Sequence, residues 1–341
     1  MSYKVVNTFP FPGADFGESL LEQFDATMKT IMCRTEDEII ENTANADAII
    51  CAATFQPFNL RVIEALSKCR IIANCGIGFH MADLDVANEY QIVVTNTPDY
   101  CLDEVSGRAL SFVLALGHKL FQLDKVVRQK QVSFILDRST LMEIVHPIYR
   151  MRDQTLGIVG FGRIGTATAL KAKGLGMRVI AYDPYVPEGV MESRWVKPVD
   201  FETLLKESDY ISLHTPLTEE TTNMFSDNEF NMMKPNCHFI NTARGGCVDQ
   251  DALIRALKES VIAGAGLDVT ADEPISADNP LLKMTNVILT GHSAGYSISA
   301  EPELFIKPMT QVIMAMKGEW PLYAVNPEVK KKWLDKWGKK G

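Results

Sequence analysis

Residues 155–185, TLGIVGFGRIGTATALKAKGLGMRVIAYDPY, constrain the fold of this chain more than any other stretch. An apolar run is followed by glycines at 160, 162 and 165, then by a helical pattern, and then by a second apolar run that ends at Asp183. That order is typical of a strand–turn–helix–strand unit in which the two strands are parallel. It predicts an α/β fold built on a parallel sheet.

The three glycines and Asp183 indicate a dinucleotide ligand. Gly160 permits a tight turn, Gly162 lets the backbone approach a pyrophosphate, and Gly165 allows the helix to pack closely on the strand. The start of the helix offers N–H groups and the positive end of its dipole to the phosphates. Asp183 lies 18 residues after Gly165, where a carboxylate can accept the ribose hydroxyls of NAD and repel the 2′-phosphate of NADP. We therefore predict NAD as the cofactor.

Short apolar runs alternate with helical patterns over most of the 341 residues, which predicts parallel strands covered by helices. In the first part of the chain we expect strands at 48–52, 70–73 and 92–94 and helices at 58–68 and 81–90. After residue 150 we expect strands at 155–160, 178–182, 209–213, 237–241, 263–269 and 286–290, and helices near 163–175, 200–206, 226–233 and 249–259. Between these parts, DEVSGRALSFVLALGHKLFQ (103–122) predicts one long helix capped by Asp103.

The C-terminal region carries two further expectations. The stretch ELFIKPMTQVIMAMKG (303–318) has a helical pattern, and we expect Pro308 to end or kink a turn. The last twelve residues, KKKWLDKWGKKG, contain six lysines. They are expected to form a solvated, frayed end.

Composition narrows the class of protein. The net charge of -9 argues against a nucleic acid or an anionic membrane as the main partner, because both need a basic surface. The seven cysteines are scattered without C-x-x-C spacing, so we expect reduced thiols and no metal site. Neither a signal peptide nor an apolar run long enough to span a membrane is visible. These features predict a cytoplasmic protein.

Three polar residues follow later apolar runs, at the strand ends where open α/β sheets bind ligands. They are Arg244 in NTARGG, Glu273 in TADEP and His292 in GHSAGYS. Each alone has an ordinary structural explanation, namely a surface arginine, a loop glutamate before proline, or a capped loop histidine. Their occurrence together, downstream of a dinucleotide motif, favours a catalytic set.

The ordered set of motifs resembles the D-isomer-specific 2-hydroxyacid dehydrogenase family, in particular its bacterial branch similar to C-terminal-binding protein and related to phosphoglycerate dehydrogenase. The likeness extends over nearly the whole chain and is carried by NTPDYCLDEVSGRAL, GIVGFGRIG, SLHTPLTEETTNMF, NTARGGCVDQDAL, GAGLDV, DEP and GHSAGYS, with a weaker match in NCGIG. It implies two Rossmann-like or flavodoxin-like parallel-sheet domains with the active site in the cleft between them. The substrate domain would be discontinuous, 1–101 plus 298–341. The NAD-binding domain would be 102–297 and would form most of a homodimer interface.

The resemblance implies catalytic roles that agree with the chemistry of the three polar residues. His292 would exchange a proton with the carbonyl oxygen, since the ordinary pKa of histidine lies near neutrality. Glu273 would hydrogen-bond the imidazole, orient it and stabilise its protonated form. Arg244 would bind the substrate carboxylate and polarise the carbonyl, because its guanidinium makes paired hydrogen bonds to planar anions.

The resemblance also implies the remaining site residues. The backbone N–H groups of Gly76, Ile77 and Gly78 would hold the other side of the substrate carboxylate. His214 would lie near the cofactor without a chemical role. The residues added to the NAD site are Arg163, Ile164, Thr215, Pro216, Thr242, Ala243 and Asp268, the last expected to hold the nicotinamide carboxamide.

Two departures from the family pattern lie on the substrate side. The chain has GIGFHM where relatives often have G-x-G-x-D-N, and Asn74 stands where the similar branch often has a basic residue. They leave the substrate open, so the leading hypothesis is an NAD-dependent interconversion of a 2-oxo acid and a D-2-hydroxy acid. Phosphite oxidation on the same scaffold and an NAD(H)-sensing, corepressor-like scaffold are the alternatives. Formate oxidation is disfavoured, because formate dehydrogenases of this family usually have glutamine where Glu273 stands.

Overall fold

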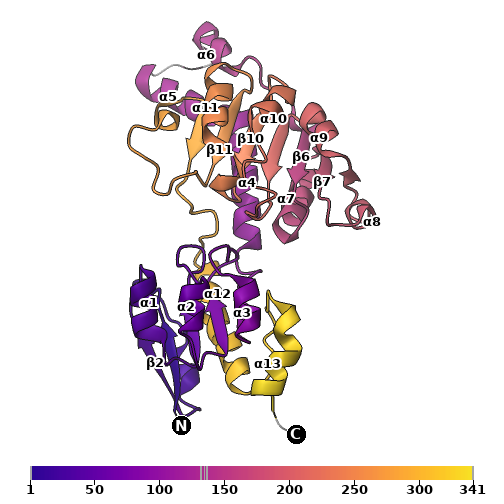
Figure 1. Ribbon diagram of the computed structural model, residues 1–341. Coiled ribbons are helices and arrows are strands. Elements are labelled where there is room, and N and C mark those ends of the chain that lie inside the picture. The colour runs from indigo at the N-terminus through magenta and orange to yellow at the C-terminus, as the bar shows by residue number, and fades with distance from the viewer. Residues whose placement is uncertain (1, 131–132, 134, 136, 340–341) are drawn as a thin grey trace. The chain divides into compact units, whose positions relative to one another are not determined.

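The computed structural model describes residues 2–130, 133, 135 and 137–339. The chain forms two compact units, one made of Met1–Tyr100 and Ser297–Gly341 and the other of Cys101–Tyr296. Each unit contains one sheet with helices on both of its faces (Figure 1), and the strand pairs are parallel. The predicted α/β fold with two parallel-sheet domains is therefore confirmed. Residues 1 and 340–341 of the predicted substrate domain lie outside the described residues.

The first unit is a five-stranded sheet with the order β2-β1-β3-β4-β5. Its strands are β1 (Tyr3–Asn7), β2 (Ala26–Thr30), β3 (Ala48–Cys51), β4 (Ile71–Asn74) and β5 (Val93–Thr95). Its helices are α1 (Glu36–Thr43), α2 (Leu60–Glu64), α3 (Leu84–Glu89), α12 (Ala300–Met316) and α13 (Lys330–Trp337). Buried side chains of α1, α2 and α3 pack on one face of the sheet, and those of α12 and α13 pack on the other.

The second unit is a seven-stranded sheet with the order β12-β11-β10-β9-β6-β7-β8. Its strands are β6 (Thr155–Val159), β7 (Arg178–Tyr182), β8 (Lys197–Pro198), β9 (Tyr210–Leu213), β10 (His238–Asn241), β11 (Gly264–Leu267) and β12 (Val287–Leu289). Its helices are α4 (Leu102–Gly117), α5 (Leu120–Lys130), α6 (Arg138–Val145), α7 (Arg163–Gly174), α8 (Glu188–Glu192), α9 (Phe201–Glu207), α10 (Asp227–Met232) and α11 (Gln250–Lys258).

The seven-stranded sheet is buried on both faces. Alternate residues such as Val159 and Phe239 pack against α9, α10 and α11, while Ile158 and Ile240 pack against α4 and α7. Burial on both faces explains why the sequence shows continuous apolar runs here instead of an alternating pattern.

The chain path brings the candidate functional loops together. After β6 the chain adds β7 and β8 on one side of that strand, then returns to add β9, β10, β11 and β12 on the other. The boundary between β6 and β9 is thus a topological switch point, where ligands of open α/β sheets bind beyond the carboxyl ends of the strands.

The prediction of one continuous helix over 103–122 is wrong. Helix α4 ends at Gly117, and a separate helix, α5, begins at Leu120. Lys119, between them, has a left-handed backbone with φ 52°. Its Nζ donates to the carbonyl of Ile144 at 2.7 Å, which holds this turn. The cap prediction is also wrong, since Cys101 is the N-cap and Asp103 lies in the first turn.

The helix predicted over 303–318 is confirmed, whereas the frayed end predicted for the lysine-rich segment is wrong. Helix α12 runs through Pro308 without ending there, because its buried face, including Phe305 and Met309, packs on the sheet. The lysine-rich segment forms α13 up to Trp337, and Trp333 is fully buried with its Nε1 donating to the carbonyl of Arg70 at 2.8 Å. The lysines made this segment look fully polar, but its tryptophans form an apolar face that packs on the first unit.

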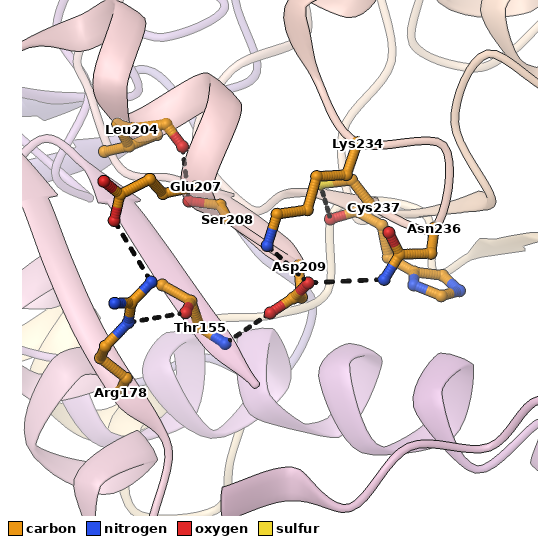
Figure 2. A network of polar contacts seen from close by, with 10 residues as sticks. Thr155, Arg178, Leu204, Glu207, Ser208, Asp209, Lys234, Asn236 and Cys237 are labelled. Atoms are coloured by element: carbon orange, nitrogen blue, oxygen red, sulfur yellow. Dashed lines mark hydrogen bonds and ion pairs between the residues drawn. The ribbon is translucent and has the colours of Figure 1, made fainter. Parts of the chain in front are cut away.

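The amino edge of the seven-stranded sheet is tied together by buried Asp209 (Figure 2). Its carboxylate accepts from the Thr155 N–H at 2.8 Å, from Lys234 Nζ at 2.9 Å and from Asn236 Nδ2 at 3.4 Å. These contacts join the starts of β6, β9 and β10. A surface hollow of about 660 Å³ lies at this edge, and its lining includes Asp209 and Lys234.

Candidate active site

The three predicted catalytic residues follow three neighbouring strands of the second unit. Arg244 comes after β10, Glu273 after β11 and His292 after β12, and these strands are adjacent in the sheet. Since parallel strands end at the same edge, the order of the sheet brings the three loops to one side.

The imidazole of His292 is paired with the carboxylate of Glu273, with 2.6 Å between Nδ1 and Oε2. Burial raises the pKa of Glu273. The hydrogen bond and charge of His292, the Thr270 N–H and the charge of Arg244 outweigh burial and hold that pKa below its ordinary value. Glu273 is thus ionised at neutral pH, which makes Nδ1 of His292 the donor in this contact.

The turn that carries His292 has a left-handed backbone, with φ 56° at the histidine. Such a conformation is uncommon for a residue with a Cβ and has to be held by its surroundings. Asp268, just beyond β11, supplies this support: its carbonyl accepts the His292 N–H at 2.5 Å, and its carboxylate accepts the N–H groups of Ser293 at 3.0 Å and Ala294 at 2.9 Å. The predicted cofactor residue Asp268 therefore also orients the histidine loop.

Arg244 lies in a loop that packs on the loop of Glu273. Glycine is required at position 245, because a Cβ there would overlap the carbonyl of Thr270. The N–H of Thr270 in turn donates to Glu273 Oε1 at 3.3 Å. Arg244 is half-buried, and its Nη1 donates to the carbonyl of Ala243 at 2.6 Å. A cation, a carboxylate and an imidazole are thus brought together by rigid loops.

The glycine motif forms a turn between β6 and α7. Gly160 has φ 91°, and a Cβ there would lie 2.8 Å from the backbone carbonyl of His214, so only glycine lets the turns after β6 and β9 meet. A Cβ on Gly165 would overlap the Gly160 carbonyl, whereas one on Gly162 would meet no protein atom within 4 Å. The space beside Gly162, at the start of a helix whose first residues are Arg163 and Ile164, fits a phosphate group.

The other predicted cofactor residues lie along the same edge. Asp183 follows β7 and accepts from the Phe161 N–H at 2.7 Å and the Tyr185 N–H at 2.9 Å, which ties it to the glycine turn. Thr215 and Pro216 follow β9, and Thr242 and Ala243 follow β10. Within the part of the chain that the structure describes, the buried hydroxyl of Thr242 has no hydrogen-bond partner. An unmet buried hydroxyl at this edge fits a bound ligand, so the residues present are suited to NAD.

His214 cannot serve as the acid in place of His292. Burial lowers the pKa of His214 to about 3, so its ring is neutral over the physiological range. Its Nε2 lies 2.9 Å from Ser212 Oγ. A Cβ on Gly160 would lie 2.8 Å from the carbonyl of His214, so the backbone of this histidine borders the glycine turn. Its place near the cofactor without a chemical role stays a prediction.

The predicted carboxylate-binding loop, Gly76 to Gly78, follows β4 in the first unit. All three carbonyls in the loop accept side-chain donors: Asn74 Nδ2 contacts those of Gly76 and Gly78 at 3.0 and 2.9 Å, and Asn96 Nδ2 contacts that of Ile77 at 2.9 Å. In a trans peptide the N–H points opposite to the preceding carbonyl. The N–H groups of Ile77 and Gly78 therefore point away from these buried amides, as an anion site requires.

Sequence reasoning did not identify the polar residues that shape these loops, chiefly Asn74, Asn241 and the supporting role of Asp268. A usable signal is present, because each stands at or just beyond the end of an apolar strand, where a buried polar side chain needs partners in the following loop. Among the described residues, no group of three or more His, Cys, Asp or Glu side chains is arranged to hold a metal ion. Of the helices in that same part of the chain, none is long and apolar enough to cross a membrane.

The chain is similar to several proteins of known family. A family model described as "D-isomer specific 2-hydroxyacid dehydrogenase, NAD binding domain" matches residues 110–294. The chain is 39% identical over 293 residues to a glyoxylate reductase of Korarchaeum cryptofilum, covering 86% of each protein. It is 35% identical over 302 residues to a D-3-phosphoglycerate dehydrogenase of Archaeoglobus fulgidus, covering 89% of this chain and 55% of that protein. The crystal structure of D-lactate dehydrogenase from Aquifex aeolicus with NAD and lactic acid matches with a TM-score of 0.82 at 27% identity, covering 96% and 98% of the two chains.

These similarities confirm the family resemblance and the predicted NAD cofactor, while the names of the relatives differ in substrate. The proposed branch within the family stays a prediction. Because the family model matches more than half of the chain and the relatives match most of it, the protein belongs to the D-isomer-specific 2-hydroxyacid dehydrogenase family and is an NAD-dependent oxidoreductase.

Proposed function

We propose that this protein interconverts a 2-oxo acid and the corresponding D-2-hydroxy acid, with His292, Glu273 and Arg244 as its catalytic residues. The observation that carries this proposal is the 2.6 Å contact between His292 Nδ1 and Glu273 Oε2, next to the loop of Arg244. An oriented acid/base beside a fixed cation is what the reduction of a carbonyl next to a carboxylate requires.

The cofactor is bound at the carboxyl edge of the seven-stranded sheet. The turn Gly160–Gly165 and the start of α7 hold the pyrophosphate, Asp183 holds the adenosine ribose, and Thr215, Pro216, Thr242, Ala243 and Asp268 line the remainder. When bound, NADH supplies the hydride that reduces the carbonyl carbon. Ionised Asp183 selects NADH over NADPH by repelling the 2′-phosphate.

The proton is handled by His292. Its Nε2 donates to the carbonyl oxygen during reduction and takes the proton back during oxidation. Ionised Glu273 stabilises the protonated imidazole through Nδ1 and keeps the ring in one orientation, so no reorganisation is needed when charge develops.

The substrate carboxylate is bound by two groups of donors. Arg244 contributes a planar guanidinium that makes paired hydrogen bonds to the carboxylate and polarises the neighbouring carbonyl. The N–H groups of Ile77 and Gly78 contribute a second, uncharged set of donors, shaped as an anion-binding turn.

The test is a screen for oxidation of NADH by glyoxylate, hydroxypyruvate, pyruvate, longer 2-oxo acids and aromatic 2-oxo acids, each repeated with NADPH. We expect turnover well above background with at least one acid and with NADH preferred. NADH binding without turnover of any acid would favour a sensing scaffold instead, and reduction of NAD by phosphite would favour the phosphite-type alternative.

We also propose a homodimer formed through the NAD-binding unit. Helix α5 of that unit exposes large apolar side chains, with Leu120 52%, Phe121 58% and Val127 45% exposed. Exposed apolar groups on one short helix are typical of a surface covered by a partner. Light scattering after size-exclusion chromatography should give twice the mass of the chain, and a monomer mass for Phe121→Asp would support this helix as the contact.

A further inference from the structure

A buried asparagine ends one strand in each of the two sheets and shapes the loop that follows it. In the first unit Asn74 is the last residue of β4 and is fully buried. Its Nδ2 donates to the carbonyls of Gly76 and Gly78 at 3.0 and 2.9 Å, and its Oδ1 accepts the Ala53 N–H at 2.6 Å. One amide thus joins the loop to the neighbouring strand and turns two carbonyls inward.

Asn241 occupies the equivalent position in the second unit. It is the last residue of β10 and is 1% exposed. Its Oδ1 accepts the Ala243 N–H and its Nδ2 donates to the Arg244 carbonyl, both at 2.9 Å. The backbone on both sides of Arg244 is thereby fixed to one side chain, and the Asn241 carbonyl also accepts the N–H of Asp268, the residue that supports the histidine turn.

We propose that Asn74 and Asn241 are positioning residues of the substrate carboxylate site, an assignment that rests on the proposed function. Asn74 turns the peptide between Gly76 and Ile77 so that the Ile77 N–H is presented to an anion, and it also holds the Gly78 carbonyl at the end of the loop. Asn241 sets the loop from which Arg244 extends. Each sheet thus uses the same device to present one of the two groups of carboxylate donors.

The chemistry of the amide explains why asparagine occupies both positions. The loop carbonyls need donors and the nearby backbone N–H groups need an acceptor. An amide offers two N–H donors and a separate oxygen acceptor, whereas a hydroxyl has only one hydrogen to donate.

The test compares Asn74→Ala and Asn241→Ala with a matched control, Asn326→Ala. Asn326 is also fully buried in the first unit, accepts the Val94 N–H at 2.9 Å and donates to the Ile92 carbonyl at 3.0 Å, but it shapes neither loop. For each variant we would measure the Tm, the Kd of NADH, the Kd of oxamate in the presence of NADH, and kcat and KM for the best acid from the screen. Oxamate serves as an unreactive carboxylate probe.

All three variants should lose stability, but only Asn74→Ala and Asn241→Ala should bind oxamate about tenfold or more weakly. The Kd of NADH should stay unchanged in Asn74→Ala and Asn326→Ala. In Asn241→Ala it should rise less than the Kd of oxamate, because the loop that Asn241 holds also carries Ala243 of the cofactor site. Asn74→Ala should raise KM with kcat largely kept, whereas Asn241→Ala should raise KM and also lower kcat, because Arg244 polarises the carbonyl as well. This difference separates the two positions.

The positioning role would be overturned if Asn74→Ala and Asn241→Ala kept the Kd of oxamate and the KM of the wild type. It would also be overturned if Asn326→Ala weakened oxamate binding as much as they do. If an alanine variant does not fold, Asn74→Ser and Asn241→Ser keep one hydrogen-bonding hydroxyl and should show intermediate oxamate affinity. Wild-type protein that binds NADH but neither oxamate nor any 2-oxo acid overturns both proposals. If the wild-type enzyme is active but the Asn74 and Asn241 variants keep its oxamate affinity and KM, only the positioning role is overturned.

Discussion

The two edges of the seven-stranded sheet use charge in different ways. At the amino edge, Asp209 is paired with Lys234 at 2.9 Å and also accepts the Thr155 N–H, while Arg178 contacts Glu207 at 3.2 Å (Figure 2). The charged groups named here are paired with one another and with the backbone, although His238 Nδ1, at the start of β10, has no partner among the described residues. That edge stabilises the sheet.

The carboxyl edge keeps polar groups that the described protein atoms do not fully satisfy. The buried Thr242 hydroxyl and His214 Nδ1 have no partner among the described residues, and the space beside Gly162 is open. Arg244 and the His292–Glu273 pair stand in loops that are held by hydrogen bonds from buried neighbours such as Asn241 and Asp268. Substitutions should therefore cost activity at the carboxyl edge and stability at the amino edge.

The largest effect should come from Arg244→Lys. Lysine keeps the charge but loses the planar pair of donors, so kcat/KM for the 2-oxo acid should fall by ~100-fold or more, at about 1.4 kcal/mol per tenfold. The Kd of NADH should change little. Steady-state kinetics and fluorescence titration would measure both quantities.

Arg255→Lys is the matched control for this change. Arg255 makes a paired contact with Asp227 at 3.0 and 2.6 Å, but on the exposed surface of α11. Its kinetic constants should stay those of the wild type. If Arg244→Lys kept the kcat/KM of the wild type, Arg244 would be an ordinary surface charge and not a substrate-binding residue.

The next largest effect concerns the choice of cofactor. Asp183→Ala removes the carboxylate that accepts the ribose hydroxyls and repels the 2′-phosphate, so the preference for NADH over NADPH should narrow by ~10-fold or more. The ratio of the two Kd values, from fluorescence titration, is the quantity to compare. Equal affinity of the wild type for both cofactors would contradict the role of Asp183.

A smaller effect, visible as a shift in pH, should follow from Glu273→Gln. Because its pKa is held below the ordinary value, Glu273 stays ionised over the range in which a histidine titrates. Glutamine keeps the shape but removes the charge that favours the protonated imidazole. In the reducing direction, which needs protonated His292, the falling limb of kcat/KM should move to lower pH by about one unit.

The oxidising direction provides the internal control for this shift. It needs neutral His292, so its rising limb should move to lower pH together with the other limb, because both report one group in the free enzyme. Limbs that stay in place while the variant loses stability would show that Glu273 is only a structural loop acid.

The smallest effect on catalysis should come from Asp209→Asn at the amino edge. The amide can replace only part of the acceptor capacity of the carboxylate, so the variant should lose about 1–2 kcal/mol of stability. For a domain of this size the Tm should fall by roughly 2–8 °C. The kcat and KM values should match those of the wild type, and a loss of activity like that of Arg244→Lys would contradict the contrast between the edges.

Sequence patterns predicted every strand of the second unit except the two-residue β8 (Lys197–Pro198), and they predicted the edge at which the candidate site residues gather. Each predicted strand from 155–160 to 286–290 is present, because a strand buried on both faces reads as an apolar run. The glycine spacing and the position of Asp183 are local signals, and the parallel connection then carries Arg244, Glu273 and His292 to one edge.

The folded structure was needed for features that depend on contacts between residues far apart in the chain. The break after Gly117 coincides with the left-handed Lys119, whose Nζ donates to the distant carbonyl of Ile144. Helix α13 is held by the buried Trp333, which donates to the carbonyl of Arg70. The same holds for Asn74, whose partner Ala53 follows another strand. Apolar periodicity and turn motifs depend on residues that are close in the sequence. The hydrogen-bond partners of a buried polar group depend on which strands lie side by side in the folded sheet.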